Sequence, residues 1–265
     1  MHRLLSRASA AAVILASTAV LGAQSAAAAD LTRPVYKAPV AAPLHNWSGF
    51  YAGVNVGWGW NDSSADLVDR VGFGLGVALG QVPLSLGLKR DGVLGGGQIG
   101  YNWQTGSFVL GLETDFQGSD IHGSGGFFYP GPFAPVQTTV NSRLDWFGTV
   151  RGRVGFSPTP QALLYVTGGL AYGHINSSAS FVVTPAALGN GSVSVSETKA
   201  GWTIGAGTEW AFAANWSVKA EYLYMDLGNT ILRLYDQTTP GTYLDYKFEH
   251  RDHIVRLGVN YKFGG

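Results

Sequence analysis

The side chains that could support nucleophilic catalysis lie in two short stretches. His122 is followed closely by Ser124, and His174 is followed by Ser177 and Ser178. A serine nucleophile needs a histidine base within hydrogen-bond reach and a third group that orients this base. Neither histidine has an evident carboxylate orienter in the sequence. We therefore interpret these residues as polar surface groups and expect no catalytic residues.

Metal and cofactor chemistry has equally weak support. The chain contains no Cys, which removes disulfides, thiolate zinc sites, iron–sulfur clusters and cysteine nucleophiles together. Asp62, Asp66 and Asp69 lack the compact spacing of a calcium-binding loop. The segment 95–100 matches a dinucleotide-binding glycine pattern formally, but it lies in a predicted strand that turns into another strand rather than into a helix. We expect neither a metal nor a cofactor.

Composition narrows the class of partner. The 265 residues include 17 basic and 17 acidic side chains, and only 13% of the chain is charged. Without a basic excess or a run of Lys and Arg, the chain offers no footprint for a phosphate backbone. We expect no nucleic acid partner. Glycine is abundant: the chain has 38 glycines in 265 residues, about twice the usual content of about 7%.

The N-terminal region predicts export. Residues 1–29 combine Arg3 and Arg7 with an apolar stretch and a terminal Ala27–Ala29 run, as secretory signal peptides do. Residues 30–46, with three prolines and no apolar period, predict an extended periplasmic leader. The folded domain is expected over 47–265. No later apolar run approaches the length of a transmembrane helix.

Within this domain, apolar and small or polar residues alternate with a period of two. Such alternation predicts β-strands, because successive side chains of a strand point to opposite faces. The pattern is clear in a first run from Trp47 to Trp60 and in a last run from Ile254 to Phe263. Six further strands are expected at about 92–104, 106–118, 142–156, 161–175, 197–212 and 215–227.

Short and long connections alternate between these eight strands. The short turns lie at 104–106, 157–160 and 213–215, and the expected long loops at 61–91, 119–141, 176–196 and 228–248. All short turns then lie at one end of the sheet and all long loops at the other. The expected fold is all-β, an eight-stranded antiparallel up-and-down transmembrane β-barrel with short periplasmic turns.

Aromatic residues indicate which face of the strands meets lipid. All eight Trp fall near predicted strand ends, at Trp47, Trp103, Trp210 and Trp216 toward the short turns and at Trp58, Trp60, Trp146 and Trp202 toward the long loops. Two aromatic levels that flank a band of aliphatic residues are typical of a barrel that crosses a bilayer.

The opposite face carries equal numbers of acidic and basic residues: Glu113, Asp115, Arg151, Arg153, Glu209, Lys219, Glu221 and Arg256. On a soluble barrel the same residues would form the solvent-exposed exterior, and periodicity alone leaves this alternative open. The glycines between them suit a crowded concave face better. We favour the membrane barrel, with the eight charges lining its lumen as a paired network.

Several segments together resemble a known family. The chain is similar to the small outer-membrane β-barrel proteins of alphaproteobacteria, termed porin family or outer-membrane immunogenic proteins, in segments 47–53, 97–103, 111–115, 145–155, 164–172 and 221–222. The resemblance implies an eight-stranded barrel in the outer membrane of a Gram-negative bacterium, a surface antigen without catalytic residues. The C-terminal stretch also resembles the signal that the barrel-assembly machinery reads, with Gly258, Tyr261 and Phe263 at its key positions, although Gly264 and Gly265 follow the last aromatic residue.

These observations predict a structural and surface-interaction role. The expected partners are outer-membrane lipid and lipopolysaccharide, the barrel-assembly machinery, and an external ligand at the long loops. An eight-stranded barrel has an interior just wide enough for side chains to fill it, so we expect a lumen largely closed by the paired charges. A narrow channel for small ions or solutes is the alternative. The third hypothesis is an outer-membrane lipid hydrolase that uses the Ser and His residues.

Overall fold

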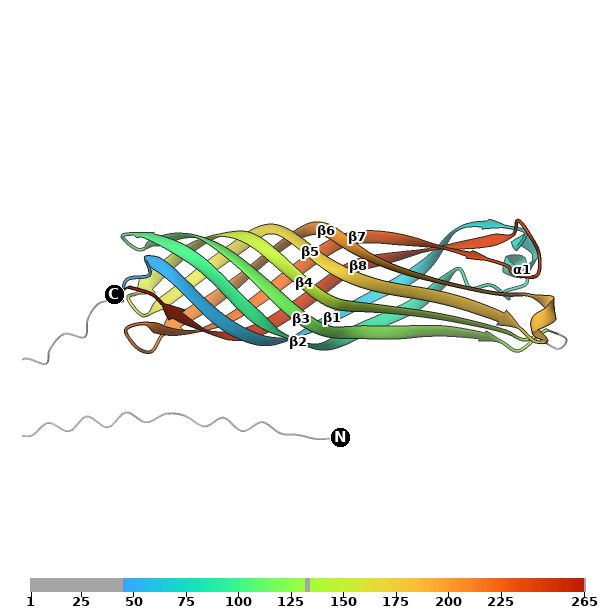
Figure 1. Ribbon diagram of the computed structural model, residues 1–265, viewed down its shortest axis with the longest axis horizontal. Coiled ribbons are helices and arrows are strands. Elements are labelled where there is room, and N and C mark those ends of the chain that lie inside the picture. Colours follow the sequence, from blue (N-terminus) through green and yellow to red (C-terminus); the bar gives the residue numbers. More distant parts are fainter. Residues whose placement is uncertain (1–44, 132–133, 265) are drawn as a thin grey trace, which may run out of the picture. The chain divides into compact units, whose positions relative to one another are not determined.

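The computed structural model describes residues 45–131 and 134–264. Eight antiparallel strands follow one another in chain order, and β1 pairs with β8 to close a barrel (Figure 1), which confirms the expected fold. The elements are β1 (Gly49–Val71), α1 (Gly74–Ala78), β2 (Ser85–Thr105), β3 (Phe108–Tyr129), β4 (Val136–Thr159), β5 (Ala162–Val183), η1 (Ala186–Leu188), β6 (Asn190–Ala211), β7 (Trp216–Tyr235) and β8 (Tyr243–Lys262). The predicted signal peptide and residues 30–44 of the predicted leader lie outside the described residues.

Outward-facing apolar side chains form a belt around the half of the barrel nearer the short turns. On β1, Val54 and Val56 are each 67% exposed, whereas Tyr51 and Asn55 on the other face are buried. Aromatic residues border the belt at two levels, with Trp103, Trp210 and Trp216 at one and Trp58, Trp60, Trp146 and Trp202 at the other. This is the arrangement that a bilayer with two polar interfaces favours.

Trp47 departs from the prediction that all tryptophans line these levels. It is 3% exposed and packs in a buried cluster with Val109, Leu163 and Ala211 at the short-turn end. Its backbone N–H donates a hydrogen bond of 2.8 Å to Oε1 of Gln104. Trp47 precedes the first residue of β1, so the alternation of the strand does not determine where its side chain points.

The four expected long loops are mostly strand, which corrects the sequence prediction. The strands have 20 to 24 residues, about twice the 9–11 needed to cross a hydrocarbon core. We call the parts beyond the belt the extension: residues 61–71, 85–91, 119–129, 136–144, 175–183, 190–201, 227–235 and 243–252. Only the hairpin tips remain as turns, with α1 and η1 among them.

The polarity of the two faces reverses in the extension. On β2, Leu86 and Leu88 point inward and are buried, while Lys89 points outward and is exposed. Polar outward residues in alternation with apolar inward residues are the pattern of a soluble barrel or sandwich. The sequence prediction weighed soluble and membrane barrels as alternatives, and each strand contains both patterns in succession.

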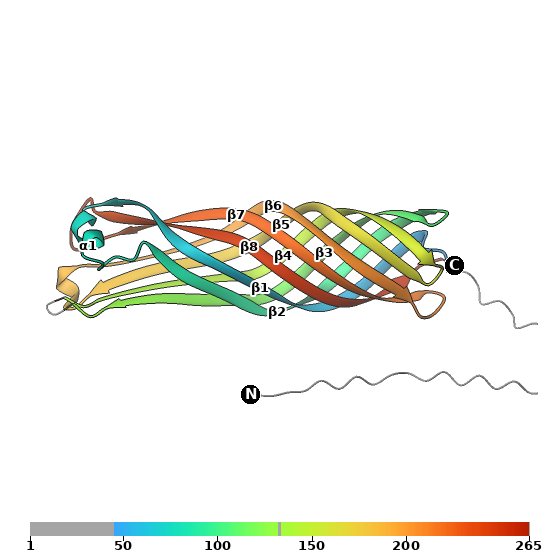
Figure 2. The ribbon, with the colours of Figure 1, turned by 180° about the vertical axis from the view of Figure 1, so that it is seen from behind.

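The extension consists of two four-stranded sheets. Pairing between β2 and β3 ends at Asp91 and His122, and pairing between β6 and β7 ends at Trp202 and Asp226. Within the described residues, pairing continues to the hairpin tips among β7, β8, β1 and β2, and among β3, β4, β5 and β6. The two layers are visible beyond the steeply tilted strands of the belt in Figures 1 and 2.

A hydrophobic core fills the space between these two sheets. Leu86, Leu88, Leu232, Tyr246 and Phe248 come from one sheet and are buried together with Val140, Ala179 and Phe181 from the other. Two packed sheets with interdigitating inner faces form a β-sandwich core. The same eight strands therefore build a barrel in the belt and a sandwich beyond it.

Candidate functional site

All eight charged residues that the sequence placed in the lumen lie inside the belt half of the barrel. Each of them is at most 3% exposed. Strand register brings several opposite charges face to face, because Glu113 lies opposite Arg151 on the neighbouring strand, and Glu221 lies opposite Arg256. Opposed residues on one face of an antiparallel pair are close enough for direct contact.

Arg151 lies at the centre of this network. Its Nη2 donates hydrogen bonds to Glu113 and, at 2.9 Å, to Oδ2 of Asp115. Its Nη1 donates to Oε1 of Glu221 at 3.0 Å, and its Nε donates to the Thr149 hydroxyl at 2.9 Å. One guanidinium group thus contacts three carboxylates from two strands.

Arg256 and Lys219 complete the central cluster. The Arg256 Nε donates to Oε2 of Glu221 at 2.6 Å, and its Nη2 donates to Oδ2 of Asp115 at 2.9 Å. Lys219 Nζ donates to both oxygens of Glu113, each at 2.9 Å, although β7 and β3 are not neighbouring strands. The contact between Lys219 and Glu113 therefore crosses the lumen.

Arg153 links this cluster to the short-turn end. Its guanidinium lies between two tyrosine rings, 4.8 Å from the Tyr51 centroid and 5.1 Å from the Tyr165 centroid. Its Nη1 donates to Oε2 of Glu209 at 3.2 Å. The Tyr51 hydroxyl donates to Glu113 at 2.7 Å, so cation–π contacts and hydrogen bonds combine in one layer.

Apolar layers lie on both sides of the network inside the barrel. Toward the short turns lies the Trp47 cluster. Toward the extension lies a second buried cluster: Leu94, Ile121, Leu144, Phe147, Ala171, Ile175, Leu223, Met225, Leu227 and Ile254. Both clusters consist of buried hydrophobic side chains, as close-packed protein interiors do.

A second polar layer, which was not predicted from the sequence, lies beyond this apolar cluster. Arg90 Nη2 donates to both oxygens of Asp252, at 3.0 and 3.2 Å, and both side chains are 1% exposed. His250 lies nearby, with its Nε2 2.9 Å from the Thr230 hydroxyl. On β8, Arg256, Ile254, Asp252 and His250 alternate along the inward face. The period of two that placed Arg256 in the lumen could therefore have identified Asp252 and His250, four and six residues before it.

His250 lies in the extension, outside the membrane-spanning belt. Burial, with the Arg90 and Lys199 cations nearby, lowers the pKa of His250 to about 3. The imidazole is therefore neutral at physiological pH. A neutral histidine between two apolar cores costs less to bury than a charged one.

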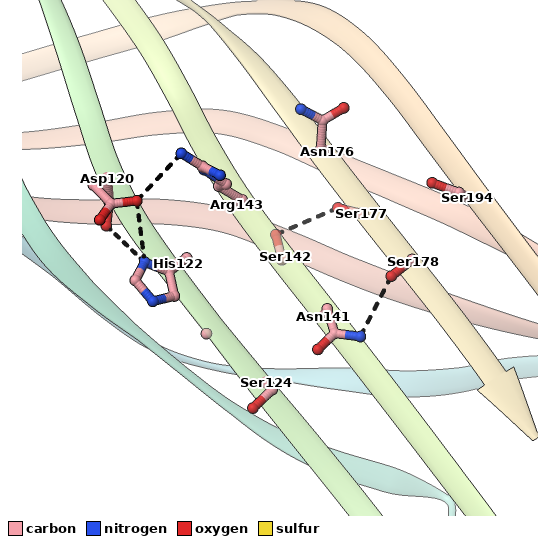
Figure 3. Close-up of a pocket in the computed structure, with 11 residues that line it drawn as sticks. Asp120, His122, Ser124, Asn141, Ser142, Arg143, Asn176, Ser177, Ser178 and Ser194 are labelled. Carbon is pink, nitrogen blue, oxygen red and sulfur yellow. Dashed lines mark hydrogen bonds and ion pairs between the residues drawn. The ribbon is translucent and has the colours of Figure 1, made fainter.

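Of the histidine and serine candidates for catalysis, His122, Ser124 and Ser178 lie on the outer face of the extension (Figure 3). His174 stacks on Trp146, with ring centroids 5.7 Å apart, and Ser177 is buried. His122 Nδ1 lies 2.8 Å from the backbone oxygen of Asp120 and 3.4 Å from its carboxylate. Ser124 lies apart from the His122 ring in this view. His122 thus has a nearby carboxylate but no contact with the predicted serine.

His174 contacts neither of the two serines predicted for it. Its Nε2 lies 3.1 Å from the Ser196 hydroxyl and its Nδ1 lies 3.3 Å from the Thr198 hydroxyl. Ser177 points inward, where its hydroxyl lies 3.3 Å from that of Ser142. A threonine hydroxyl, and no carboxylate, therefore occupies the position of the orienting group.

The residues of the predicted assembly signal lie on the last strand and just beyond it. Tyr261 and Phe263 point outward at the aromatic level nearer the short turns, with ring centroids 5.2 Å apart. Tyr261 also packs edge-on against Trp216 of the neighbouring strand, at 5.0 Å. Gly258 points inward, where an added Cβ would lie 2.9 Å from the backbone oxygen of Val54.

Closed antiparallel topology, an apolar exterior with two aromatic levels and a charged interior define a transmembrane β-barrel. The chain belongs to the family described as outer membrane protein beta-barrel domain, whose model matches residues 13–263. This membership confirms the resemblance noted in the sequence and places the protein in the Gram-negative outer membrane.

Two relatives have names that agree with this placement. The 31 kDa outer-membrane immunogenic protein of Brucella melitensis biotype 1 is 41% identical over 259 residues, covering 95% of this chain and 99% of the relative. The 22 kDa outer membrane protein of Rhizobium leguminosarum bv. viciae is 31% identical, covering 86% and 82%. Among solved structures, the outer membrane protein OprG from Pseudomonas aeruginosa aligns with a TM-score of 0.47 and 12% identity, covering 84% of this chain and 99% of that one. Neither relative's name is that of an enzyme.

Proposed function

We propose that this protein is a structural barrel of the outer membrane whose own side chains close the lumen, and that it presents the extension at the cell surface. The observation that carries the first part is the buried ion network around Arg151, whose four acids and four bases are each at most 3% exposed. Isolated charges in such an interior cost several kcal/mol each, so mutual pairing is nearly compulsory. The apolar layers on both sides support the same interpretation.

A narrow path for small ions is the second candidate function. The observation in its favour is that Arg153 Nη2 and Arg256 Nη1 are buried and have no hydrogen-bond partner among the described residues. Such groups bind water readily, and a chain of waters along them would be the start of an ion path. Conductance across a planar bilayer separates the two candidates, because a packed interior gives no steady current.

A hydrolase function has less support. One histidine has a carboxylate but no serine, and the other has a serine but no carboxylate. A catalytic triad needs both partners on the same imidazole. We therefore propose no catalytic role. Lipopolysaccharide around the belt and the barrel-assembly machinery at Gly258, Tyr261 and Phe263 remain proposed partners.

Surface display is testable with single cysteines, because the chain contains none. Gln237→Cys places a thiol at an exposed hairpin tip of the extension, and Ala214→Cys places a matched one at an exposed short turn. We expect a membrane-impermeant maleimide to label the Gln237→Cys variant on intact cells and the Ala214→Cys variant only after lysis. The reverse pattern would show that the extension faces the periplasm.

A further inference from the structure

A cavity of about 340 Å³ lies at the outer tip of the extension, and residues of both sheets line it. Its walls come from all four long hairpins: Phe73 and Val82 from the first, Val136 from the second, Phe181 from the third and Leu244 from the fourth. Cavities of 300–1,000 Å³ are the usual size of small-molecule sites. The proposed structural role of the barrel does not account for this cavity.

The floor of the cavity is apolar and aromatic. Val82, Val136, Phe181 and Leu244 are buried, and they belong to or adjoin the sandwich core. The Phe73 and Phe181 rings meet edge to face, with their centroids 5.5 Å apart. A flat aromatic ligand gains both apolar contact and edge-to-face geometry against such rings.

The lining of the cavity also contains groups that form hydrogen bonds. These are the hydroxyls of Thr138, Thr239 and Thr242 and the amide of Gln81. Apolar walls with a few convergent polar groups are the composition of most small-molecule sites, because the polar groups orient a ligand that the walls hold.

Asp236 is the only charged residue that lines the cavity within the described part of the chain. Burial acts to raise the pKa of Asp236, but hydrogen bonds from the Thr238 backbone and hydroxyl and from the Asn190 backbone outweigh this effect and lower the pKa. The group is therefore a carboxylate at neutral pH. With no basic residue on the wall to offset it, it repels an anionic ligand.

We propose that this tip cavity binds a small molecule with an aromatic or otherwise flat apolar body and a neutral or cationic polar group. The apolar floor receives the body of the ligand, and the threonine hydroxyls and Asp236 receive its polar end. The negative charge of Asp236, which no basic residue on the cavity wall offsets, disfavours anionic ligands.

Thiol protection tests this proposal. Val183 lines the cavity, so Val183→Cys provides a reporter in the otherwise cysteine-free chain, and Ser85→Cys provides a control on the outer face of the same extension. The probes share one ring system: 2-naphthalenemethanol, 2-naphthylmethylammonium and 2-naphthoate. We measure the rate of maleimide labelling of each variant, reconstituted in nanodiscs, against probe concentration.

We expect the alcohol and the ammonium to slow labelling at position 183, with no change at position 85. The naphthoate should require a concentration higher by roughly tenfold, equivalent to about 1.4 kcal/mol. In the Asp236→Asn variant, the concentration of naphthoate needed for protection should lie closer to that of the other two probes. Equal protection of both thiols, no protection by any probe, or a naphthoate as effective as the alcohol would overturn the proposal. If Val183→Cys does not fold, Leu188→Cys, on the exposed η1 turn, reports on the same cavity.

Discussion

Arg151 shows why charged side chains persist in the interior of this barrel. Its guanidinium contacts Glu113, Asp115 and Glu221, and all four side chains are almost fully buried. Attraction between buried ions offsets their desolvation only when hydrogen bonds satisfy most donors and acceptors. The planar fork of arginine meets this requirement better than lysine, because it can contact several carboxylates at fixed angles.

We expect Arg151→Ala to lower the free energy of unfolding by about 3–5 kcal/mol, because three buried carboxylates then lose one of the two arginines that they share. Urea unfolding in detergent measures the change. Arg143→Ala is the matched control: this side chain is 55% exposed and pairs with Asp120 and Asp145 on the surface. The control should cost less than about 1 kcal/mol. Equal losses in the two variants would contradict the importance of the buried network.

His250 gives the extension a dependence on pH. An unfolded histidine has a pKa near 6.5, whereas burial beside Arg90 and Lys199 lowers the pKa of His250 to about 3 in the folded protein. Between these values the unfolded chain binds a proton that the folded protein does not. The free energy of unfolding therefore falls as the pH drops from about 6.5 toward 3.

We expect His250→Gln to lose less stability than the wild type on acidification over this range, because glutamine does not titrate. Urea midpoints at pH 7 and pH 4.5 for both proteins test the expectation. The carboxylates titrate in both proteins, so their contributions to the change in midpoint cancel in the comparison. An identical fall in midpoint for wild type and variant would show that His250 is protonated without cost in the folded state.

At the scale of the strand, inward-facing glycines set how closely neighbouring backbones and side chains pack. Tyr51 on β1 lies directly opposite Gly100 on β2, with its ring over the glycine. A Cβ added at Gly100 would lie 2.3 Å from the tyrosine hydroxyl and 2.7 Å from the backbone oxygen of Leu112. The same arrangement recurs between Tyr165 and Gly207. Aromatic rings that cover strand glycines stabilise sheets in this way.

Gly100→Ala should therefore destabilise the barrel by about 1–3 kcal/mol through overpacking. Gly97→Ala, on the outward face of the same strand, is the control, since the nearest atom to its added Cβ is the Gly53 oxygen at 3.5 Å. The temperature at which each variant loses its heat-modifiable gel mobility reports the difference. A Gly100→Ala variant as stable as Gly97→Ala would mean that Tyr51 moves aside freely.

Bulges accompany the change from barrel to sandwich on two strands. On β4, Phe147 and Leu144 both point inward although three positions separate them, and a register shift lies between Leu144 and Trp146. On β7, Leu227 and Thr230 show the same change beside a shift between Asp226 and Asn229. An extra residue at a bulge re-aims the following side chains, so both apolar runs can face the core.

At the scale of the whole molecule, the topology was predictable from the sequence and the height of the barrel was not. The outward aliphatic residues between the aromatic levels predicted eight strands and their order. Beyond Trp60 and Trp146 the outward residues become polar and glycine-rich, which is also the composition of loops. Strand prediction therefore ended where the bilayer ends, although the alternation continued with reversed polarity.

The same limit explains what was missed in the candidate site. The eight charges of the belt were predictable because they alternate with lipid-facing residues along recognisable strands. Arg90 lies in the expected loop 61–91, and His250 and Asp252 lie between the expected loop 228–248 and the last predicted strand. The specific ion pairs of the network could not be predicted from the sequence either, because Lys219 contacts Glu113 across the lumen rather than along a strand pair.

Single-channel recording in planar bilayers tests most directly whether the ion network and the apolar layers close the lumen. The purified, folded wild-type barrel is added to the bilayer and recorded at fixed voltage. An eight-stranded barrel filled by side chains should give no steady conductance steps. Large, stable single-channel steps from the wild-type protein would show that the interior is open and that these side chains do not close the lumen.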